Sequence, residues 1–487
     1  MTHPACRIDT PSRTVGRGRK PRHADERPDT SSQAAGPPRA SYGRGVDRTP
    51  SAAPGHRGFL AATLPVLDLA VASVAAVGRA AARAGGTAPG PGPDPERVAA
   101  AFTSDRLLRL DGAAVDGFAP LSGFFRTGDG WVRTHANYPH HRERLLRLLG
   151  LPDAAARDDV TDRLAGWSAQ DVEDGAADAG AIAVRVRTPA GWHDAPGRGE
   201  GSAVPVRTGL RDDAGAPAPL PRGPRPLAGA RVLDLTRVIA GPVATRTLAL
   251  LGADVLRVDP PHPAEIGWQH LDAGQGKRSA LLDLRRGDDL ARAQDLLDHA
   301  DVLVTGYRPG AVEAFGLRPR AGAVRARVAA WDDGPWAGRR GFDSIVQAAS
   351  GIALVEGSRD GTTGPVADAT PGALPAQALD HATGYLVAAA VVDALAARAA
   401  DGRGREVDGV LARTAAALLA GTARDPAHGD PLAPGAGCVV GHRVVLDGTP
   451  VALTTARPAL DRLGDETVED YAAPAHPWGS DDARWAE

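Results

Sequence analysis

Asp380 is the residue whose type and position best suit covalent chemistry. It lies in the sequence QALDHATG at 377–384, directly before an apolar stretch that predicts a helix over 384–397. A carboxylate at a helix start commonly caps the helix and interacts favourably with its dipole, but a carboxylate can also act as a nucleophile. Composition and spacing leave both interpretations open.

Lys277 and Arg278 are candidates for phosphate binding. They lie in GQGKRS at 274–279, which fails the Walker pattern because Leu271 occupies the first glycine position and Arg278 follows the lysine. The basic residues of this chain are nearly all arginine, with lysine only at positions 20 and 277. The compact charge of lysine suits a phosphate, so a phosphate contact and a solvated basic pair are equal alternatives.

Two turns follow predicted strands. In TRVIAGP at 236–242, Gly241 and Pro242 open the next helix and leave its first N–H groups free for an anion. The turn YRPG at 307–310 lies at the edge where open α/β sheets bind ligands. Each turn also fits a purely structural role. The sequence contains no GxGxxG motif, which argues against a conventional dinucleotide site.

Metal and disulfide chemistry have little support. Three histidines fall within 135–141, but their spacing matches no common metal pattern, and Pro139 predicts the start of a surface helix instead. Cys6 and Cys438 lie near opposite ends of the chain, outside any CxxC pair or Cys/His cluster. We therefore expect no metal and no disulfide framework, which fits a reducing, cytoplasmic location.

The composition is that of a soluble globular protein. Of 487 residues, 43% are hydrophobic and 24% are charged, and 56 basic residues face 59 acidic ones, for a net charge of −3. This balance gives no general attraction for nucleic acid or acidic membranes. The apolar stretch 60–77 is interrupted by Asp68 and preceded by a long polar segment, so it predicts a buried helix rather than a signal peptide or a membrane span.

Composition also divides the chain into segments that must position these residues. Residues 1–58 are rich in Arg, Pro, Ser and Gly and lack hydrophobic periodicity, so we expect them to be disordered. The other predicted segments are a helix and linker (59–94), a small mixed α/β domain (95–208), a Pro/Gly-rich linker (209–226), a Rossmann-like domain (227–421) and a loop-rich tail (422–487) with one strand at 443–446.

The segment 227–421 alternates short apolar strands with helices. Strands are predicted at 231–235, 253–258, 279–284 and 301–305, and helices at 241–251, 288–299 and 384–397. Apolar strands that alternate with helices indicate parallel βαβ units with right-handed crossovers. The predicted fold class is α/β, a Rossmann-like doubly wound parallel sheet plus a smaller mixed α/β domain.

Several motifs in this half resemble, in the same order, the class III CoA-transferase family of the CaiB/BaiF type. The family's catalytic aspartate lies four residues before a glycine that enters a long helix, which corresponds to Asp380 and Gly384. The similar stretches, from Leu227 to about Leu419, are LAGARVLDLT with AGP at 227–242, GKRS with LDL at 276–284, DVLV with RPG at 301–310, GFD at 341–343 and GRGR at 402–405.

The resemblance implies the CoA-transferase family III fold, an interlinked homodimer, and transfer of coenzyme A between an acyl-CoA thioester and a carboxylic acid. Asp380 would attack the donor thioester and hold CoA as an aspartyl thioester until an acceptor carboxylate takes it. Asp343 matches a position that supports the catalytic carboxylate in some members. Coenzyme A is then a substrate and not a tightly bound cofactor. The residues expected near CoA are Arg237, Ala240, Gly241, Lys277, Arg278, Tyr307, Arg308 and Arg340.

Two other functions remain open within the family. A segment similar to the family's small domain, 129–192, precedes the matching half, which indicates a permuted domain order. The stretch 316–341 is shorter than in the family, as if a helix were missing, so a catalytically degenerate CoA-thioester-binding relative is one alternative. The other is a 2-methylacyl-CoA racemase, which needs two acid/base groups. Racemases carry histidine where this chain has Phe342, and His381 is the candidate substitute.

Overall fold

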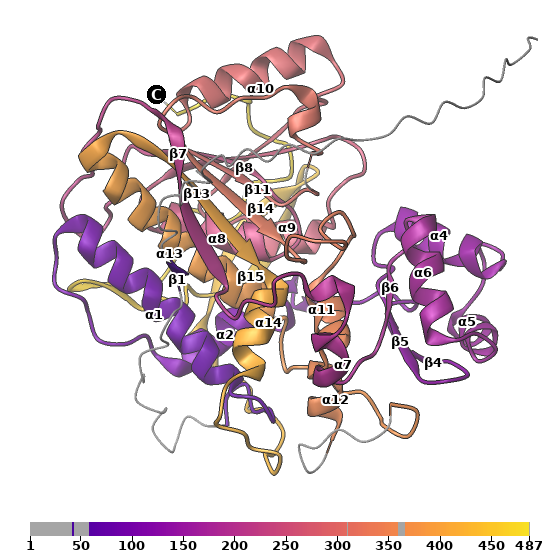
Figure 1. Ribbon diagram of the computed structural model, residues 1–487. Coiled ribbons are helices and arrows are strands. Elements are labelled where there is room, and N and C mark those ends of the chain that lie inside the picture. Colours follow the sequence, from indigo (N-terminus) through magenta and orange to yellow (C-terminus); the bar gives the residue numbers. More distant parts are fainter. Residues whose placement is uncertain (1–40, 43–57, 309, 359–365, 487) are drawn as a thin grey trace, which may run out of the picture. The chain divides into compact units, whose positions relative to one another are not determined.

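An eight-stranded sheet forms the centre of the fold (Figure 1). The computed structural model describes residues 41–42, 58–308, 310–358 and 366–486, which belong to one compact unit, Arg39–Glu487. Across the sheet the strands lie in the order β1-β7-β13-β12-β11-β8-β9-β10. Their bounds are β1 Ser41–Tyr42, β7 Val206–Ala214, β8 Arg231–Leu235, β9 Asp254–Asp259, β10 Arg278–Leu281, β11 Val302–Thr305, β12 Val324–Ala329 and β13 Arg403–Val410.

Strands β8 to β13 are parallel to one another, whereas β7 pairs antiparallel with β13 and β1 pairs antiparallel with β7 at the edge of the sheet. The chain enters the parallel part at β8, continues outward through β9 and β10, and then returns to the other side of β8 with β11, β12 and β13. The prediction of an α/β fold with a parallel sheet is confirmed. Open sheets of this kind bind ligands at the carboxyl ends of the strands, where the strand order reverses. Here that point lies between β8 and β11.

Alternate side chains of the strands enter two hydrophobic cores, one on each face of the sheet. Val232 and Val302 belong to the core that contains α1, α8 and α13, whereas Leu233 and Leu303 belong to the core with α10. Figure 1 shows α10 and α13 on opposite sides of the strands. Burial on both faces explains why these strands are almost uniformly apolar. The helices are α1 Val66–Gly85, α8 Ala240–Leu250, α10 Gly287–His299 and α13 Ala378–Asp401.

Helix α13 is the central helix of the larger core. It starts before the predicted position at Gly384, so Asp380 lies within its first turn. Gly384 lets α13 approach α8 closely, because a Cβ there would lie 2.5 Å from the carbonyl oxygen of Ala240. Within the described residues α13 is the one helix long and apolar enough to cross a membrane, and 72% of its most apolar window is buried inside the protein.

Three smaller sheets and several helices accompany the central sheet. Strands β4, β5 and β6 form an antiparallel sheet that packs on α4, α5 and α6 around a core of its own. Strands β14, β15, β2 and β3 form a second sheet, and β16 pairs with β17. The remaining bounds are α2 Pro95–Phe102, α3 Ser104–Leu107, β2 Arg109–Leu110, β3 Ala113–Ala114, β4 Gly123–Arg126, β5 Trp131–Thr134, α4 Pro139–Leu149, α5 Arg157–Leu164, α6 Ala169–Ala179, β6 Ala183–Arg185, α7 Pro189–His193, α9 Gly267–Ala273, α11 Asp343–Ser350, α12 Ile352–Gly357, α14 Leu411–Leu419, β14 Val439–Leu446, β15 Thr449–Ala456, β16 Arg462–Leu463 and β17 Glu466–Thr467, with 3₁₀ turns at Pro196–Arg198, Glu313–Phe315 and Ala436–Cys438.

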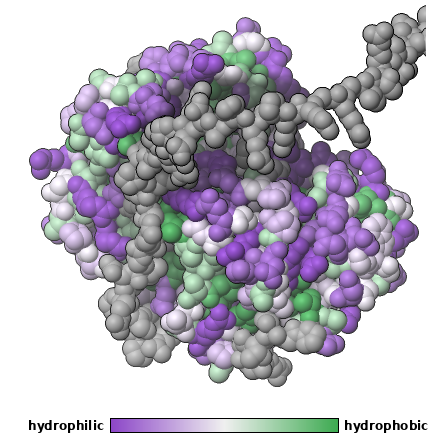
Figure 2. All heavy atoms as spheres, viewed as in Figure 1, coloured by the Kyte–Doolittle hydropathy of each residue, from purple (hydrophilic) through white to green (hydrophobic). Residues whose placement is uncertain are grey.

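The face of the molecule drawn in Figure 2 is mainly polar. Hydrophilic side chains cover most of the face drawn in Figure 2, with smaller hydrophobic areas between them. Single exposed apolar residues of this kind are normal on soluble proteins. The exposed large apolar side chains come from separate parts of the chain and are Phe118, Leu210, Phe315, Leu432 and Val445.

The structure corrects two segments predicted to be irregular. Residues 209–226 are predicted as a linker, but the chain up to Ala214 forms β7, because antiparallel pairing with β13 satisfies the backbone groups of both strands. The tail is predicted to hold one strand at 443–446, but it forms the hairpin β14–β15. Asp447 and Gly448 turn this hairpin with φ of 48° and 78°. Asp-Gly is a strong signal for such a two-residue turn.

Two further predictions concern the N-terminal segment and the connection between β11 and β12. Of the segment 1–58, the structure describes only Ser41–Tyr42, in β1, and Gly58, so the predicted disorder lies outside the described residues. The connection from β11 to β12 contains the 3₁₀ turn Glu313–Phe315 and no α-helix among its described residues. The loss of a helix between 316 and 341, which the resemblance to the family implies, stays a prediction.

Candidate active site

A cleft lies at the carboxyl ends of the parallel strands. Its volume is about 370 Å³, and its walls come from the turns after β8, β9 and β11, the end of β12 and the start of α13. This is the place that the reversal of strand order between β8 and β11 indicates. The predicted site residues that line it are Asp380, Arg237, Ala240, Gly241, Tyr307, Arg308 and Arg340.

Asp380 presents a buried carboxylate to this cleft. The residue is 6% exposed, and its side-chain oxygens accept no hydrogen bond from the described residues, although its backbone N–H is bonded. Burial raises the pKa of Asp380 well above 3.8, and the charge of Asp343 raises it further. The lone pairs of this carboxylate are therefore free, and a raised pKa makes the ionised form a stronger nucleophile and base.

Asp343 hydrogen-bonds the backbone of Asp380 from the interior of the protein. It is the first residue of α11 and is fully buried. Its Oδ2 accepts the backbone N–H of Asp380 at 2.9 Å, and Gln347 donates to its Oδ1. Burial raises the pKa of Asp343 to about 6, although these hydrogen bonds oppose the increase. Asp343 thus replaces the missing side-chain cap of α13, since the N-cap residue Gln377 makes no capping bond.

The start of α8 faces the same cleft. Among the described residues the backbone N–H groups of Ala240 and Gly241 find no acceptor. Gly241 is needed at this turn, because a Cβ there would lie 2.4 Å from the Cβ of Thr236. Val238, in the same turn, has a φ of 72°, which is strained for a β-branched residue. The turn therefore offers two free backbone donors, an arrangement suited to an anion or a developing oxyanion.

Arginines give the cleft a positive potential. Arg340 donates to the carbonyl oxygen of Gly180 at 3.3 Å, and burial followed by the nearby charges of Arg308 and Arg144 lowers its pKa. Like charges gathered beside a cleft attract an anion such as a phosphate. Among the residues that line the cleft, Asp380 is the single acidic residue. The cationic residues there are Arg237, Arg308, Arg339 and Arg340.

Arg237 lies deeper and is partly neutralised. Its Nε is 3.3 Å from Glu265 Oε2 and 3.7 Å from Asp259 Oδ1. Tyr138 donates its hydroxyl hydrogen to Glu265 Oε1 at 2.7 Å, and the Arg237 guanidinium lies over the Tyr138 ring at 5.6 Å. Arg237 Nη2 is buried and has no hydrogen-bond partner in the described part of the chain. Tyr307 lines the cleft beside this network, and burial raises its pKa.

Lys277 does not reach the cleft, in contrast to its predicted phosphate contact. Its Nζ is 3.1 Å from Asp234 Oδ2, 2.9 Å from Thr245 Oγ1 and 3.2 Å from the carbonyl oxygen of Pro242. All three ammonium hydrogens therefore have acceptors within the protein. Burial lowers the pKa of Lys277 to about 8. Lys277 fixes the start of α8 to β8 and positions the turn rather than a ligand.

Arg278 also lies outside the cleft. It is the first residue of β10, so it belongs to the amino end of the sheet, whereas the cleft lies at the carboxyl ends. Its Nη2 is 2.7 Å from Oδ1 of Asp254, the first residue of β9, and its Nη1 donates to the carbonyl oxygen of Arg484. Arg278 therefore does not line the cleft with the other residues expected near CoA.

His140 and His141 line the cleft, although the sequence predicts a surface helix at this place. Helix α4 begins at Pro139 as expected, but His141 is 5% exposed. The ring of His141 packs edge-on against Phe342, with centroids 6.0 Å apart. Sequence periodicity carries no signal for this contact, because it depends on the long-range bond of Tyr138 to Glu265.

His381 faces away from the cleft. It lines a separate small cavity, and its ring stacks on Phe102 with centroids 5.1 Å apart. Successive helical residues point about 100° apart at 3.6 residues per turn, so Asp380 and His381 lie on different sides of α13. Phe342 does line the cleft, stacked on His135 with ring centroids 3.8 Å apart. The structure therefore does not bring His381 to Asp380 as a second acid/base group.

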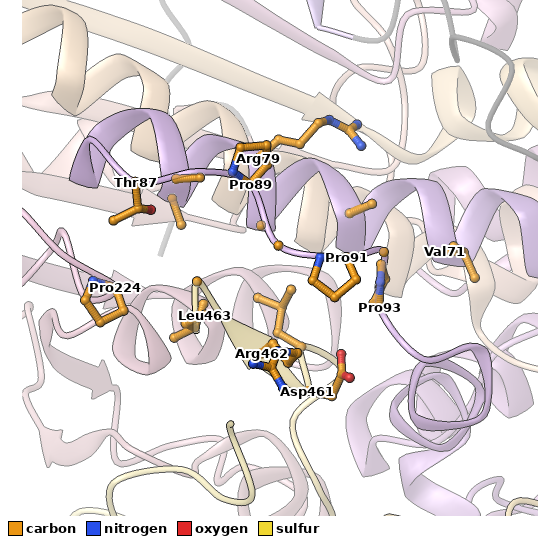
Figure 3. Close-up of a pocket in the computed structure, with 18 residues that line it drawn as sticks. Val71, Arg79, Thr87, Pro89, Pro91, Pro93, Pro224, Asp461, Arg462 and Leu463 are labelled. Carbon is orange, nitrogen blue, oxygen red and sulfur yellow. The ribbon is translucent and has the colours of Figure 1, made fainter. Parts of the chain in front are cut away.

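A second pocket lies between α1 and the C-terminal segment (Figure 3). Figure 3 shows Val71 and Arg79 from α1, the following proline-rich segment with Pro91, and Asp461 and Arg462 near β16. Its volume is about 210 Å³, and it contains none of the predicted site residues.

In the described part of the chain no three or more His, Cys, Asp or Glu side chains are grouped to hold a metal ion.

Comparison with known proteins places the matching half in one family. The family model CoA-transferase family III matches residues 227–438, which includes Asp380, Asp343 and the strands that border the cleft. The motifs that resemble class III CoA-transferases in sequence lie within this region, so the predicted family is confirmed.

Named relatives share this half of the chain. It is 39% identical over 196 residues to an acetyl-coenzyme A transferase of Hypoxylon pulicicidum, a match that covers 38% of this chain and 32% of that protein. It is 33% identical over 199 residues to a probable fatty acyl-CoA transferase of Mycobacterium tuberculosis. This match covers 37% of this chain and 48% of that protein. A solved CaiB/BaiF family protein from Brucella suis is 27% identical over 40% of this chain and 55% of that chain, with a TM-score of 0.36. The matches thus span less than half of these curated relatives.

Proposed function

Because residues 227–438 belong to CoA-transferase family III, we propose that this chain transfers coenzyme A between an acyl-CoA thioester and a carboxylic acid, with Asp380 as the nucleophile. One observation carries the proposal: the Asp380 carboxylate, without a hydrogen-bond partner among the described residues, lines a cationic cleft at the carboxyl ends of a parallel sheet. The names of the relatives, an acetyl-coenzyme A transferase and a probable fatty acyl-CoA transferase, support the same reaction class.

In the first half of the reaction, an Asp380 oxygen attacks the thioester carbonyl carbon, and the C–S bond breaks to give a mixed anhydride and the CoA thiolate. The thiolate then attacks the Asp380 carbonyl carbon, which releases the donor acid as its carboxylate and leaves an aspartyl-CoA thioester. The acceptor carboxylate repeats both steps in reverse order. No water, oxidant or reductant enters this sequence, and two easier steps replace one difficult step.

Two features of the cleft would lower the barriers. The free N–H groups of Ala240 and Gly241 are positioned to hydrogen-bond an oxygen that becomes negative in the transition state, and one such donor is typically worth about 3–4 kcal/mol. The hydrogen bond from the Asp380 backbone to Asp343 fixes the start of α13. A nucleophile held in place loses less entropy when it reacts.

The phosphates of coenzyme A fit the outer, arginine-rich part of the cleft. Arg308, Arg339 and Arg340 line it, with His140 beside them. Arg308 is exposed and Arg340 half-buried, so a phosphate can reach them without full desolvation. Since Lys277 and Arg278 are bonded elsewhere, we assign the phosphate contacts to Arg308, Arg339 and Arg340 in their place.

The decisive experiment is trapping of the intermediate. The protein is incubated with a panel of acyl-CoAs, treated with hydroxylamine and digested, and the peptide with Asp380 is analysed by mass spectrometry. We expect a hydroxamate on Asp380 with a productive donor, and none in Asp380→Ala. The proposal is wrong if transfer survives Asp380→Ala within about tenfold, which corresponds to about 1.4 kcal/mol of barrier, or if α-proton exchange occurs without a covalent adduct.

Assembly and location form part of the same proposal. We propose a cytoplasmic homodimer in which residues 95–208 act as the small domain in a permuted order. Light scattering of the full chain at several concentrations tests the dimer. A monomer with full transferase activity would contradict it and leave the chemistry intact.

A further inference from the structure

His141 is a buried polar side chain in the wall of the cleft. It lies in α4, in the segment that precedes the matched half 227–438, and it is 5% exposed. Its Nδ1 has no hydrogen-bond partner among the described residues. A buried imidazole nitrogen without a hydrogen bond lowers the stability of the fold, unless a ligand or a water molecule supplies the missing partner. Since His141 lines the cleft that also holds Asp380, the missing partner belongs in that cleft.

The ring of His141 is held firmly by aromatic neighbours. It packs edge-on against Tyr138, with centroids 5.5 Å apart, and edge-on against Phe342 at 6.0 Å. Tyr138 is in turn bonded to Glu265, and Phe342 directly precedes Asp343, which bonds the backbone of Asp380. A side chain fixed in this way is pre-organised to contact a ligand next to the reacting carboxylate.

Arg237 provides a second unsatisfied donor in the same place. The Tyr138 ring that contacts His141 also carries the Arg237 guanidinium at 5.6 Å. Arg237 Nη2 is buried without a partner in the described chain, while its Nε is engaged by Glu265. His141 and Arg237 therefore flank one aromatic ring, and both line the cleft.

The charge of the cleft decides which ligand suits these two groups. Burial, followed by the charges of His140 and His135, lowers the pKa of His141 to about 2, so it is a neutral hydrogen-bonding group at all working pH values. Arg237 is cationic, and Asp380 is the single acid among the residues that line the cleft. A planar cation beside a neutral N–H donor, in a cationic cleft, matches a carboxylate.

We propose that His141 and Arg237 form the subsite for the carboxylate of the acceptor acid, next to Asp380. This inference rests on the proposed transferase reaction and adds a substrate-positioning role for a segment outside the matched family region. In the reaction, the two donors hold the acceptor carboxylate while one of its oxygens attacks the aspartyl thioester.

The test separates the two half-reactions. In His141→Phe, which keeps a ring of similar size but removes the nitrogens, we expect the KM of the acceptor acid to rise about tenfold or more, equivalent to about 1.4 kcal/mol of binding. The CoA adduct on Asp380 should still form from a saturating acyl-CoA donor, because that half-reaction consumes no free acid. His141→Gln, which restores an N–H donor, should recover part of the acceptor affinity.

His193→Phe serves as the matched control, because His193 is exposed and lies outside the cleft. Thermal unfolding of all three variants shows whether they are folded. Unchanged acceptor KM in a folded His141→Phe variant overturns the proposed subsite, even if Asp380 still forms its adduct. Loss of the adduct in the unaltered protein would instead refute the transferase mechanism itself, so the two failures are distinguishable.

Discussion

The backbone N–H of Asp380 donates a hydrogen bond to Oδ2 of Asp343 across 2.9 Å. This bond joins the backbone of Asp380, in α13, to the carboxylate of Asp343, in α11, and the carboxyl groups of both residues are buried with a raised pKa. Asp343 therefore has two opposing effects: it fixes the start of the helix that carries the nucleophile, and its negative charge makes Asp380 harder to ionise.

The first prediction separates these effects with Asp343→Asn. The amide keeps an oxygen for the Asp380 N–H but removes the charge that raises the pKa of Asp380. We expect the acidic limb of the kcat/KM profile to move to lower pH, because the negative charge beside the Asp380 carboxyl is removed. Asp283→Asn, at an exposed pair with Arg285, is the control. An acidic limb that stays in place would show that the two carboxylates are not coupled.

The second prediction concerns stability and pH. The pKa of Asp380 is higher in the folded protein than in the unfolded chain, because of burial and then Asp343, so folding favours proton uptake. The stability contributed by the protonated carboxyl is complete below the unfolded pKa of about 4 and is lost as pH rises through the folded pKa. Asp380→Asn should therefore be more stable than the unaltered protein at pH 7.5.

We expect the gain in the free energy of unfolding to be measurable at pH 7.5, because the carboxylate must ionise there against burial and the charge of Asp343. It should disappear near pH 4, where both proteins are neutral at this position. Urea unfolding at the two pH values measures the difference. If the variant is less stable at pH 7.5, the Asp380 carboxylate has a stabilising partner and is not the free nucleophile that we propose.

The third prediction tests the structural role of Lys277. Lys277→Met leaves Asp234 buried and ionised without its cation, and breaking a buried ion pair in this way costs about 3–5 kcal/mol. We expect a large fall in the free energy of unfolding but little change in the KM for acyl-CoA of the fraction that folds. The double variant with Asp234→Asn should regain part of the stability. A raised KM without loss of stability would restore the phosphate role for this lysine.

The fourth prediction compares two arginines that the sequence alone treats alike. Arg340→Gln should raise the KM for acyl-CoA about tenfold and weaken its dependence on salt, because a cationic contact to a phosphate is removed. Arg278→Gln should leave the KM unchanged and lower stability by at most about 1 kcal/mol, since its pair with Asp254 is partly exposed. Steady-state kinetics at two salt concentrations measures both. Equal effects of the two substitutions would argue against the cleft as the CoA site.

The sequence by itself determined the parallel sheet and the position of Asp380. Apolar runs at 231–235 and 301–305, each followed by a turn and a helix, require burial on both faces, and this need is local enough to be predicted. Asp380 was singled out by the resemblance of 377–384 to the CoA-transferase family, and this resemblance is carried by one short segment. The start of α13 at Ala378 and the strand β7 were not predicted, because caps and edge pairing depend on partners elsewhere in the chain.

The tertiary structure decided which charged side chains face the cleft. Lys277 and Arg278 are adjacent to each other in sequence, yet one fixes α8 to Asp234 and the other lies at the amino end of the sheet. His141 reaches the same cleft as Asp380 from a segment that precedes the whole parallel sheet. Local sequence specifies what a strand or helix is, but the neighbours of a side chain are set by packing between distant elements, and only the folded chain contains that information.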